Sequence, residues 1–169
     1  MYWGWNRSWY TDSDINFSGK NYDFTLMNVQ AKDRQSDFAI DPYFNPVKFT
    51  IPQYNFRIGY QLNKNLDFSF GIDHMKYVVE QNQQSIINGS ININSSYDRN
   101  YSNDSLFLTE DFLKFEHTDG LNYVNFELRN SGSIVKFKNW HIQHIEGLGL
   151  GIMIPKTNTT LMGMERHDN

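Results

Sequence analysis

The chain has 169 residues, enough for one domain of ordinary size, and its 15 basic and 19 acidic residues give a net charge of −4. That balance provides no basic field for capturing nucleic acid. The absence of cysteine excludes a disulfide scaffold, a thiolate zinc site and a cysteine nucleophile. No apolar run is long enough for a membrane-spanning helix, and Met1–Tyr10 lacks the pattern of a signal peptide.

The composition predicts an all-β protein with long polar loops. Aromatic residues make up 16% of the chain, alanine occurs only at Ala31 and Ala39, and there are twenty asparagines. Aromatic side chains favour strands, whereas asparagine competes with helix formation. The mean hydropathy is negative. A membrane stays possible nevertheless, because a transmembrane barrel alternates apolar and polar residues and therefore looks soluble on average.

The N-terminal segment 2–10 is predicted as a strand in which three tryptophans share one parity: Trp3, Trp5 and Trp9. Tryptophans at a strand end suit a membrane interface, and the alternative is that they cap the core of a soluble β-domain. The segment 11–52 that follows is expected to be a long surface loop. It contains a small hairpin that turns at Ser18–Asn21 and continues as a strand over Tyr22–Val29.

The clearest pattern is a hairpin made by strands 53–62 and 66–79. Apolar and polar residues alternate with period two on both sides of the turn Asn63–Asn65. A three-residue loop sets Leu62 opposite Leu66, so the apolar residues of both strands fall on one face. These apolar residues are Phe56, Ile58, Tyr60, Leu62, Leu66, Phe68, Phe70 and Ile72.

A second long surface loop is expected over 80–119, where 81–104 is rich in asparagine, serine and glutamine. A second pair of strands follows at 121–137 and 140–154, joined by a turn at Lys138–Asn139. In the last strand, branched aliphatic residues alternate with almost nothing but glycine, which allows a curved sheet to close tightly.

Together these elements predict an antiparallel up-and-down β-barrel with short periplasmic turns and long outer loops. Strand 2–10 then runs outward and starts in the periplasm. The count gives five wall strands, whereas bacterial barrels have an even number of at least eight. We therefore expect 1–169 to be a single eight-stranded barrel domain seen as an N-terminal fragment, truncated at the C-terminus by about three strands.

Four stretches resemble a family of uncharacterised bacterial outer-membrane β-barrel proteins: YWGWNRSWYTDSDINFSGKNYDFTL (2–26), IPQYNFRIGY (51–60), GIDHMKYVV (71–79) and FLKFEHTDGLN (112–122). The resemblance covers nearly the whole chain and implies a fold and a location in the bacterial outer membrane, but no settled activity. In that location we expect outer-membrane lipids or lipopolysaccharide as partners, and a protein partner is not identified.

Catalysis is a weaker alternative, placed at the outer rim of the strands. His117 and His74 are expected near each other there, because the loop 80–119 joins their two strands. A lipid hydrolase needs a histidine base, a hydroxyl nucleophile and an orienting residue. Ser69, Thr118 and Asp119 are the candidates for the last two roles. The His-x-Ser-Asn pattern of lipid A deacylases is absent, since Thr118 and Asp119 follow His117 directly.

A metal site from His74, His117, Asp73 and Asp119 is a further alternative, since imidazole and carboxylate bind several divalent ions, but their spacing matches no known motif. No glycine-rich phosphate loop is present, and no cofactor is expected. Charged side chains on the polar face are expected to pair and fill the lumen, which leaves no wide pore; these are Arg7, Arg57, Glu127 and Arg129.

The sequence therefore predicts a non-enzymatic outer-membrane β-barrel with a structural or surface-interaction role in the envelope. The alternatives are a rim-located lipid A or phospholipid acyl hydrolase with a histidine base, and a soluble lipocalin-like ligand-binding barrel. The side of the sheet that is buried separates the first from the last. A soluble barrel packs the apolar residues inside, whereas a membrane barrel turns them outward.

Overall fold

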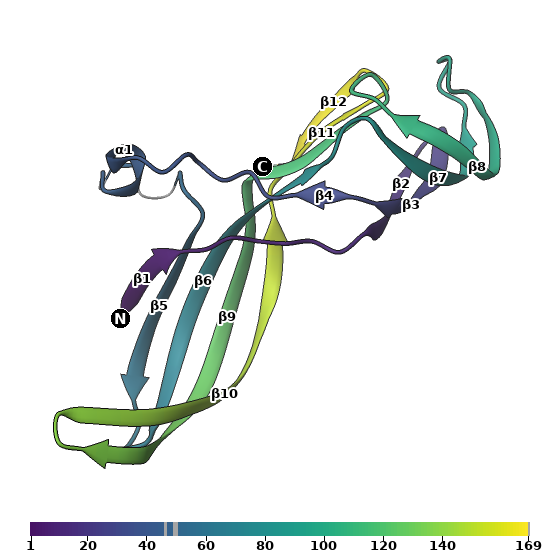
Figure 1. Ribbon diagram of the computed structural model, residues 1–169. Coiled ribbons are helices and arrows are strands. Elements are labelled where there is room, and N and C mark those ends of the chain that lie inside the picture. The colour runs from purple at the N-terminus through teal and green to yellow at the C-terminus, as the bar shows by residue number, and fades with distance from the viewer. Residues whose placement is uncertain (46, 49–50, 169) are drawn as a thin grey trace. The chain divides into compact units, whose positions relative to one another are not determined.

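A computed structural model of the chain describes residues 1–45, 47–48 and 51–168, except for the side chains of residues 167 and 168. The regular secondary structure of the described part is β-strand, apart from one kinked helical turn, α1 (Ile40–Tyr43) (Figure 1). Every strand pair with a resolved register is antiparallel. The prediction of an all-β antiparallel protein is confirmed. The strands are β1 (Tyr2–Trp5), β2 (Ser13–Gly19), β3 (Tyr22–Val29), β4 (Ala31–Lys32), β5 (Tyr54–Gln61), β6 (Leu66–Val79), β7 (Gln83–Ile91), β8 (Arg99–Leu108), β9 (Leu113–Phe137), β10 (Trp140–Pro155), β11 (Thr157–Leu161) and β12 (Met164–Asp168).

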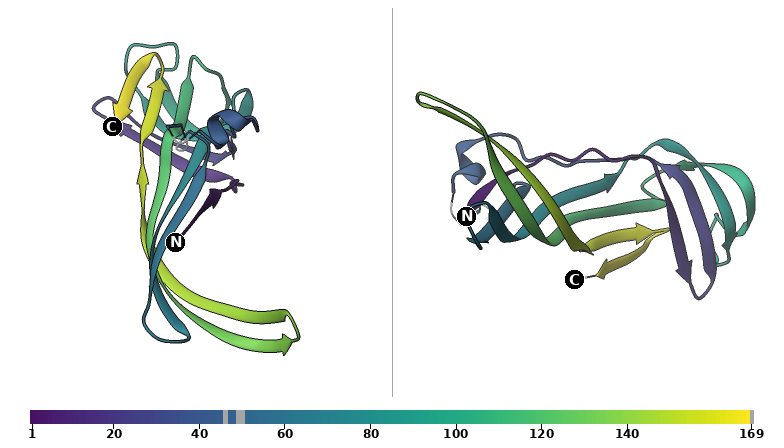
Figure 2. Two further views of the ribbon diagram at one scale, coloured as in Figure 1. Left: turned by 90° about the vertical axis from the view of Figure 1, so that its left-hand side faces the viewer. Right: turned by 90° about the horizontal axis from the view of Figure 1, so that it is seen from below.

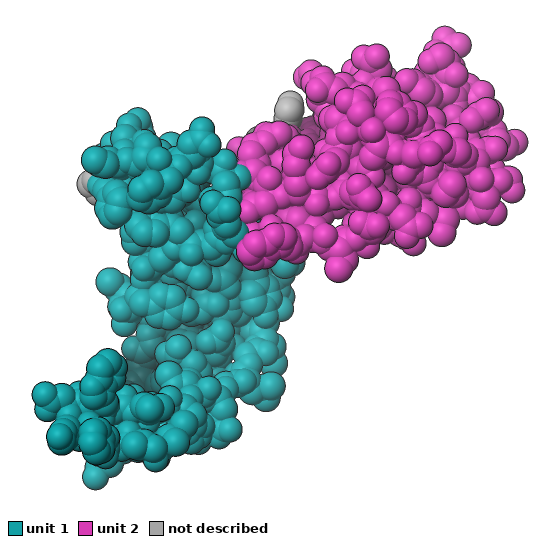
Figure 3. Space-filling view, in the orientation of Figure 1, with its two compact units in different colours: residues 1–7, 35–75, 120–155 teal, residues 8–34, 76–119, 156–169 magenta. Residues whose placement is uncertain are grey.

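The chain divides into two compact units, coloured separately in Figure 3. Unit 1 holds Met1–Arg7, Gln35–Met75 and Gly120–Pro155. Unit 2 holds Ser8–Arg34, Lys76–Asp119 and Lys156–Asn169. Strands β6 and β9 each contribute residues to both units.

Unit 1 contains the predicted wall strands. Its sheet runs in the order β1-β5-β6-β9, and β10 pairs with β9. The hairpin of β5 and β6 has the predicted register, because Tyr60 lies opposite Phe68 and the Leu62 amide donates to the Leu66 carbonyl at 2.8 Å. The β9–β10 hairpin turns at Lys138 and Asn139, as predicted, with Phe137 opposite Trp140.

The sheet of unit 1 is strongly curled, like half of a barrel (Figure 2). The described residues do not complete a closed eight-stranded barrel. β1 ends at Trp5 rather than at residue 10. The side-chain amide of the next residue, Asn6, donates to the carbonyls of Tyr54 at 3.0 Å and His74 at 3.3 Å, which ties the chain to the start of β5 and to β6.

Unit 2 differs from the expected long loops. Residues of 11–52 and 80–119 form a four-stranded sheet in the order β2-β3-β7-β8. In the asparagine-rich segment, Ile87, Ile91 and Tyr101 are buried while polar neighbours stay outside. The alternation is therefore that of a half-buried hairpin, hidden by the polar composition of its exposed face. The core consists of Phe24, Leu26, Val29, Val79, Ile87, Ile91, Tyr101, Leu108, Phe112, Leu113 and Leu161.

After β10 the chain continues along β9: β11 pairs with the start of β9, with Leu161 opposite Leu113. It then turns through Met162 and Gly163 into β12, which pairs with β11. Both turn residues have positive φ. Leu161, the last residue of β11, is buried in the core of unit 2.

Candidate functional site: the inner face of unit 1

The two faces of the unit 1 sheet have opposite chemistry, and the polar face is the buried one. Arg57 is 8% exposed, and Ser69 and Asn125 are each 1% exposed. We call the face that carries them the inner face. The opposite, outer face carries ten exposed apolar side chains: Ile58, Tyr60, Leu62, Phe68, Phe126, Leu128, Leu148, Leu150, Ile152 and Ile154.

Ion pairs fill the inner face. The Arg57 guanidinium donates two hydrogen bonds to the Asp73 carboxylate, at 3.0 and 2.7 Å, and also lies 3.7 Å from a carboxylate oxygen of Glu127. Arg129 donates to Asp67, with the closest atoms 2.7 Å apart. The predicted pairing of Arg57, Glu127 and Arg129 on the polar face is present. The fourth predicted member, Arg7, is exposed.

Glycines make room for these long side chains. A Cβ atom on Gly71 would overlap the Arg57 side chain, and one on Gly149 would stand 2.8 Å from Cγ of Glu127. Gly147 is in the same position beside Arg129, whose Cγ would be 3.0 Å away. The glycine alternation in β10 therefore provides space for the charged side chains of the neighbouring strand.

Three buried polar atoms of the inner face have no hydrogen-bond partner in the described structure. They are Nε of Arg57, Oγ of Ser69 and Oδ1 of Asn125. Asn125 uses its amide to donate to Asp73 at 3.3 Å, so its unused atom is an acceptor. Leaving such atoms unpaired in a buried position is costly, so the polar network of this face is incomplete as described.

The structure places the sequence-predicted residues of unit 1, His74 and Ser69, in different surroundings. Nδ1 of His74 lies 2.9 Å from Oδ1 of Asn122, and its ring stacks on Tyr54 with centroids 5.2 Å apart. The buried Ser69 hydroxyl has no hydrogen-bond partner among the described residues. Ser69 lies on the inner face and His74 has the opposite parity on the same strand, which directs their side chains to opposite faces of the sheet.

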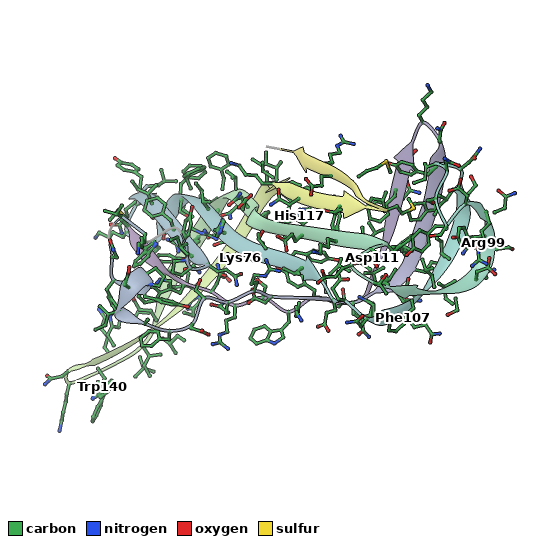
Figure 4. The ribbon with its side chains drawn as sticks, turned by 90° about the horizontal axis from the view of Figure 1, so that it is seen from above. Lys76, Arg99, Phe107, Asp111, His117 and Trp140 are labelled. Carbon is green, nitrogen blue, oxygen red and sulfur yellow. The ribbon has the colours of Figure 1, made fainter. Side chains whose placement is uncertain are left out.

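The predicted residues of unit 2 have separate partners. Nδ1 of His117 lies 3.1 Å from the Thr157 hydroxyl, beside β11 (Figure 4). The Thr118 hydroxyl donates to Glu116 at 3.0 Å, and Asp119 accepts from Asn158 at 3.0 Å. Only His117 thus has a hydroxyl neighbour, which is Thr157, a residue that the sequence pattern did not single out. None of the three forms a described hydrogen bond with another of the three.

The proposed metal ligands are divided between the units, with Asp73 and His74 in unit 1 and His117 and Asp119 in unit 2. Within the described residues, no three histidine or carboxylate side chains are grouped as a metal ion requires. The same part of the chain contains no helix with the length and apolar character needed to cross a membrane.

Unit 2 also has an open groove of about 700 Å³ that the sequence did not predict. Arg34 and Lys114 line it. Each of these cations already has a carboxylate partner, since Arg34 lies 2.9 Å from Glu116 and Lys114 lies 2.8 Å from Glu110. Such exposed pairs are typical of a solvated surface and do not by themselves indicate a ligand.

His117 should make unit 2 less stable in mild acid. Burial lowers the pKa of His117 below its ordinary value of 6.5, although a backbone hydrogen bond with Lys156 partly opposes this effect. Below pH 6.5 the unfolded chain binds a proton that the folded chain does not, so stability falls as the pH drops toward the folded-state pKa. We expect His117→Asn to reduce the difference between the urea midpoints measured at pH 7 and pH 5. An unchanged difference would contradict this role.

Comparison with known proteins adds no relative: no protein-family model, no curated protein sequence and no solved structure matches the chain. The resemblance to outer-membrane barrel proteins described above therefore stays a prediction. The observation that bears on function is the sheet of unit 1, whose apolar face is exposed and whose polar face carries the buried residues Arg57, Ser69 and Asn125.

Proposed function

We propose that the chain is a non-enzymatic β-barrel protein of the bacterial outer membrane, in which the strands of unit 1 form part of the barrel wall. One observation carries the proposal: the apolar face of this sheet is exposed, whereas the ion-paired residues of the other face are buried or partly buried. A transmembrane barrel has this arrangement, with apolar residues toward lipid and polar residues toward the lumen.

In water the exposed apolar face of unit 1 would be unfavourable. Ten large apolar side chains of the outer face are exposed on neighbouring strands, and soluble proteins rarely expose so large a contiguous patch. Unit 2 follows the opposite rule, since its apolar residues form a buried core. The apolar residues of unit 2 are thus buried, as in proteins that fold in water, whereas those of the unit 1 sheet face outward, as in transmembrane barrels. A soluble lipocalin-like barrel would need the outer face of unit 1 on its inside.

A cluster of apolar and aromatic residues lies at the end of unit 1 where β5 begins. We call it the aromatic lobe, made of Trp3, Trp5, Phe38, Tyr43 and Phe44. The Trp5 ring contacts those of Trp3, Tyr43 and Phe44 at centroid distances of 4.8, 5.4 and 5.6 Å. Trp3 and Trp5 pair with Phe56 and Tyr54, so they continue the outer face. Trp3 and Trp5 are exposed, and exposed tryptophan is typical of a membrane interface.

The role that we favour is structural or concerned with surface interaction, with outer-membrane lipids or lipopolysaccharide around the wall. The hydrolase alternative has less support, because the Ser69 hydroxyl has no hydrogen-bond partner and His117 pairs with Thr157 instead of a carboxylate. The lumen side is occupied by paired charges, which favours a filled barrel over an open pore.

Two neighbouring residues with opposite orientation provide the test. The chain has no cysteine, so Phe68→Cys and Ser69→Cys each introduce a single thiol for a nitroxide label. In the full chain reconstituted in lipid vesicles, we expect the label at 68 to collide readily with dissolved oxygen, and the label at 69 to be shielded from it. Ser69→Cys is nearly isosteric and is the matched control. Shielding from lipid at both positions, or a chain that stays soluble without detergent or lipid, would overturn the proposal.

A further inference from the structure

The long edge of β10 is the least satisfied part of the unit 1 sheet. Among the described residues, β10 pairs only with β9, and all sixteen of its residues are exposed. Inside a bilayer, backbone amides and carbonyls have no water to bind, so an open strand edge is not tolerated there. If unit 1 lies in lipid, as proposed above, this edge requires a partner strand.

The two faces of β10 indicate the pattern of that partner. Leu148, Leu150 and Ile152 carry the outer apolar surface up to the edge. On the inner face, Gly147, Gly149 and Gly151 provide no side chain and lie opposite Arg129, Glu127 and Asn125 of β9. A strand added beyond β10 would therefore continue an apolar outer face and would look across the glycines toward the polar residues of β9.

The charges of the inner face indicate what the partner has to bring. Arg57 and Arg129 provide two positive charges, whereas Asp67, Asp73 and Glu127 provide three negative ones. Glu127 has the longest of these contacts, at 3.7 Å. Beside it on β9, Oδ1 of Asn125 is a buried acceptor without a donor. Around Glu127 and Asn125, the unmet requirement is therefore for a positive charge and a hydrogen-bond donor.

We propose that the free edge of β10 pairs with an antiparallel strand that carries an arginine or lysine on its inner face, directed across Gly149 toward Glu127 and Asn125. Next-but-one strands are about 10 Å apart, a gap that two long side chains approaching from opposite sides can bridge. Arginine and lysine are donor-only cations, which matches both the carboxylate and the unpaired amide oxygen. A second copy of β10 does not meet the requirement, because it would place glycines on the inner face.

The test uses the full chain in lipid vesicles with a fluorescent donor on Leu148→Cys. Three acceptor-labelled peptides of about ten residues, the length of a membrane strand, alternate apolar and polar residues and differ only at one central inner position, which is Arg, Gln or Glu. We expect energy transfer to show that the Arg peptide binds about tenfold more tightly than the Glu peptide. Glu127→Gln should bring this ratio close to one. Glu146→Gln, which changes an outer-face carboxylate that accepts from Asn130, should leave the ratio unchanged.

Charge reversal guards against a variant that merely misfolds, because Glu127→Arg is expected to prefer the Glu peptide. Equal binding of the three peptides, or energy transfer between two copies of the chain paired through β10, would overturn the inference. The label at residue 68 separates this failure from failure of the proposed function. If residue 68 is in lipid and the peptides bind equally, only the partner strand is wrong. If residue 68 is not in lipid, both proposals fail.

Discussion

Leu150→Arg is expected to weaken folding into lipid vesicles by about 2–4 kcal/mol, the cost of placing an arginine on the lipid face of a barrel near the bilayer midplane. Leu150 is 75% exposed on the outer face of β10, opposite Phe126 of β9. The free energy of unfolding from vesicles, measured by urea titration, gives the effect. On a water-facing surface the same change would cost almost nothing, since no contact in the interior is lost.

Phe107→Arg is the matched control. Phe107 is also an apolar strand residue and is 55% exposed (Figure 4). It lies on β8 of unit 2, whose apolar residues form a buried core. We expect its replacement to change stability by no more than about 0.5 kcal/mol. Similar small effects of both substitutions would contradict a lipid environment for unit 1. Similar large effects would show that the cost of arginine is not specific to the outer face.

Arg57→Ala is expected to destabilise unit 1 by about 3 kcal/mol, because it leaves the carboxylates of Asp73 and Glu127 on the inner face without their shared cation. The guanidinium is 9% exposed, so water does not readily replace it. The substitution also removes the side chain that lies over Gly71. Chemical denaturation of the reconstituted chain measures the loss.

The control for this substitution is Arg34→Ala in unit 2. Arg34 also pairs with a carboxylate, that of Glu116 at 2.9 Å, but its side chain is 53% exposed. Exposed pairs contribute little, so we expect a loss of less than about 1 kcal/mol. Equal losses at the two arginines would mean that the inner face is as accessible to water as the surface of unit 2.

Part of the inner face is predictable from the amino-acid sequence. The alternation of 54–61 and 66–79 places Arg57 on the polar face, and the glycine alternation of 147–151 is evident in the sequence itself. The contacts of Arg129 with Asp67 and of Asn125 with Asp73 cannot be assigned in this way, because they depend on the register between β6 and β9. Likewise, Thr157 can be linked to His117 only once β11 is known to return beside β9.

The sequence by itself determined the strands, the two short turns and which residues share a face, because a period of two and local turn chemistry are properties of neighbouring residues. Only the tertiary structure decided which face is buried. The alternation of apolar and polar residues looks the same whichever face is buried. Here the inner face is the buried one, because Arg57 pairs with Asp73 there and glycines make room for the guanidinium. The tertiary structure also turned the supposed loops of 11–52 and 80–119 into a second sheet, since Ile87 and Leu108 become a core only when distant strands meet.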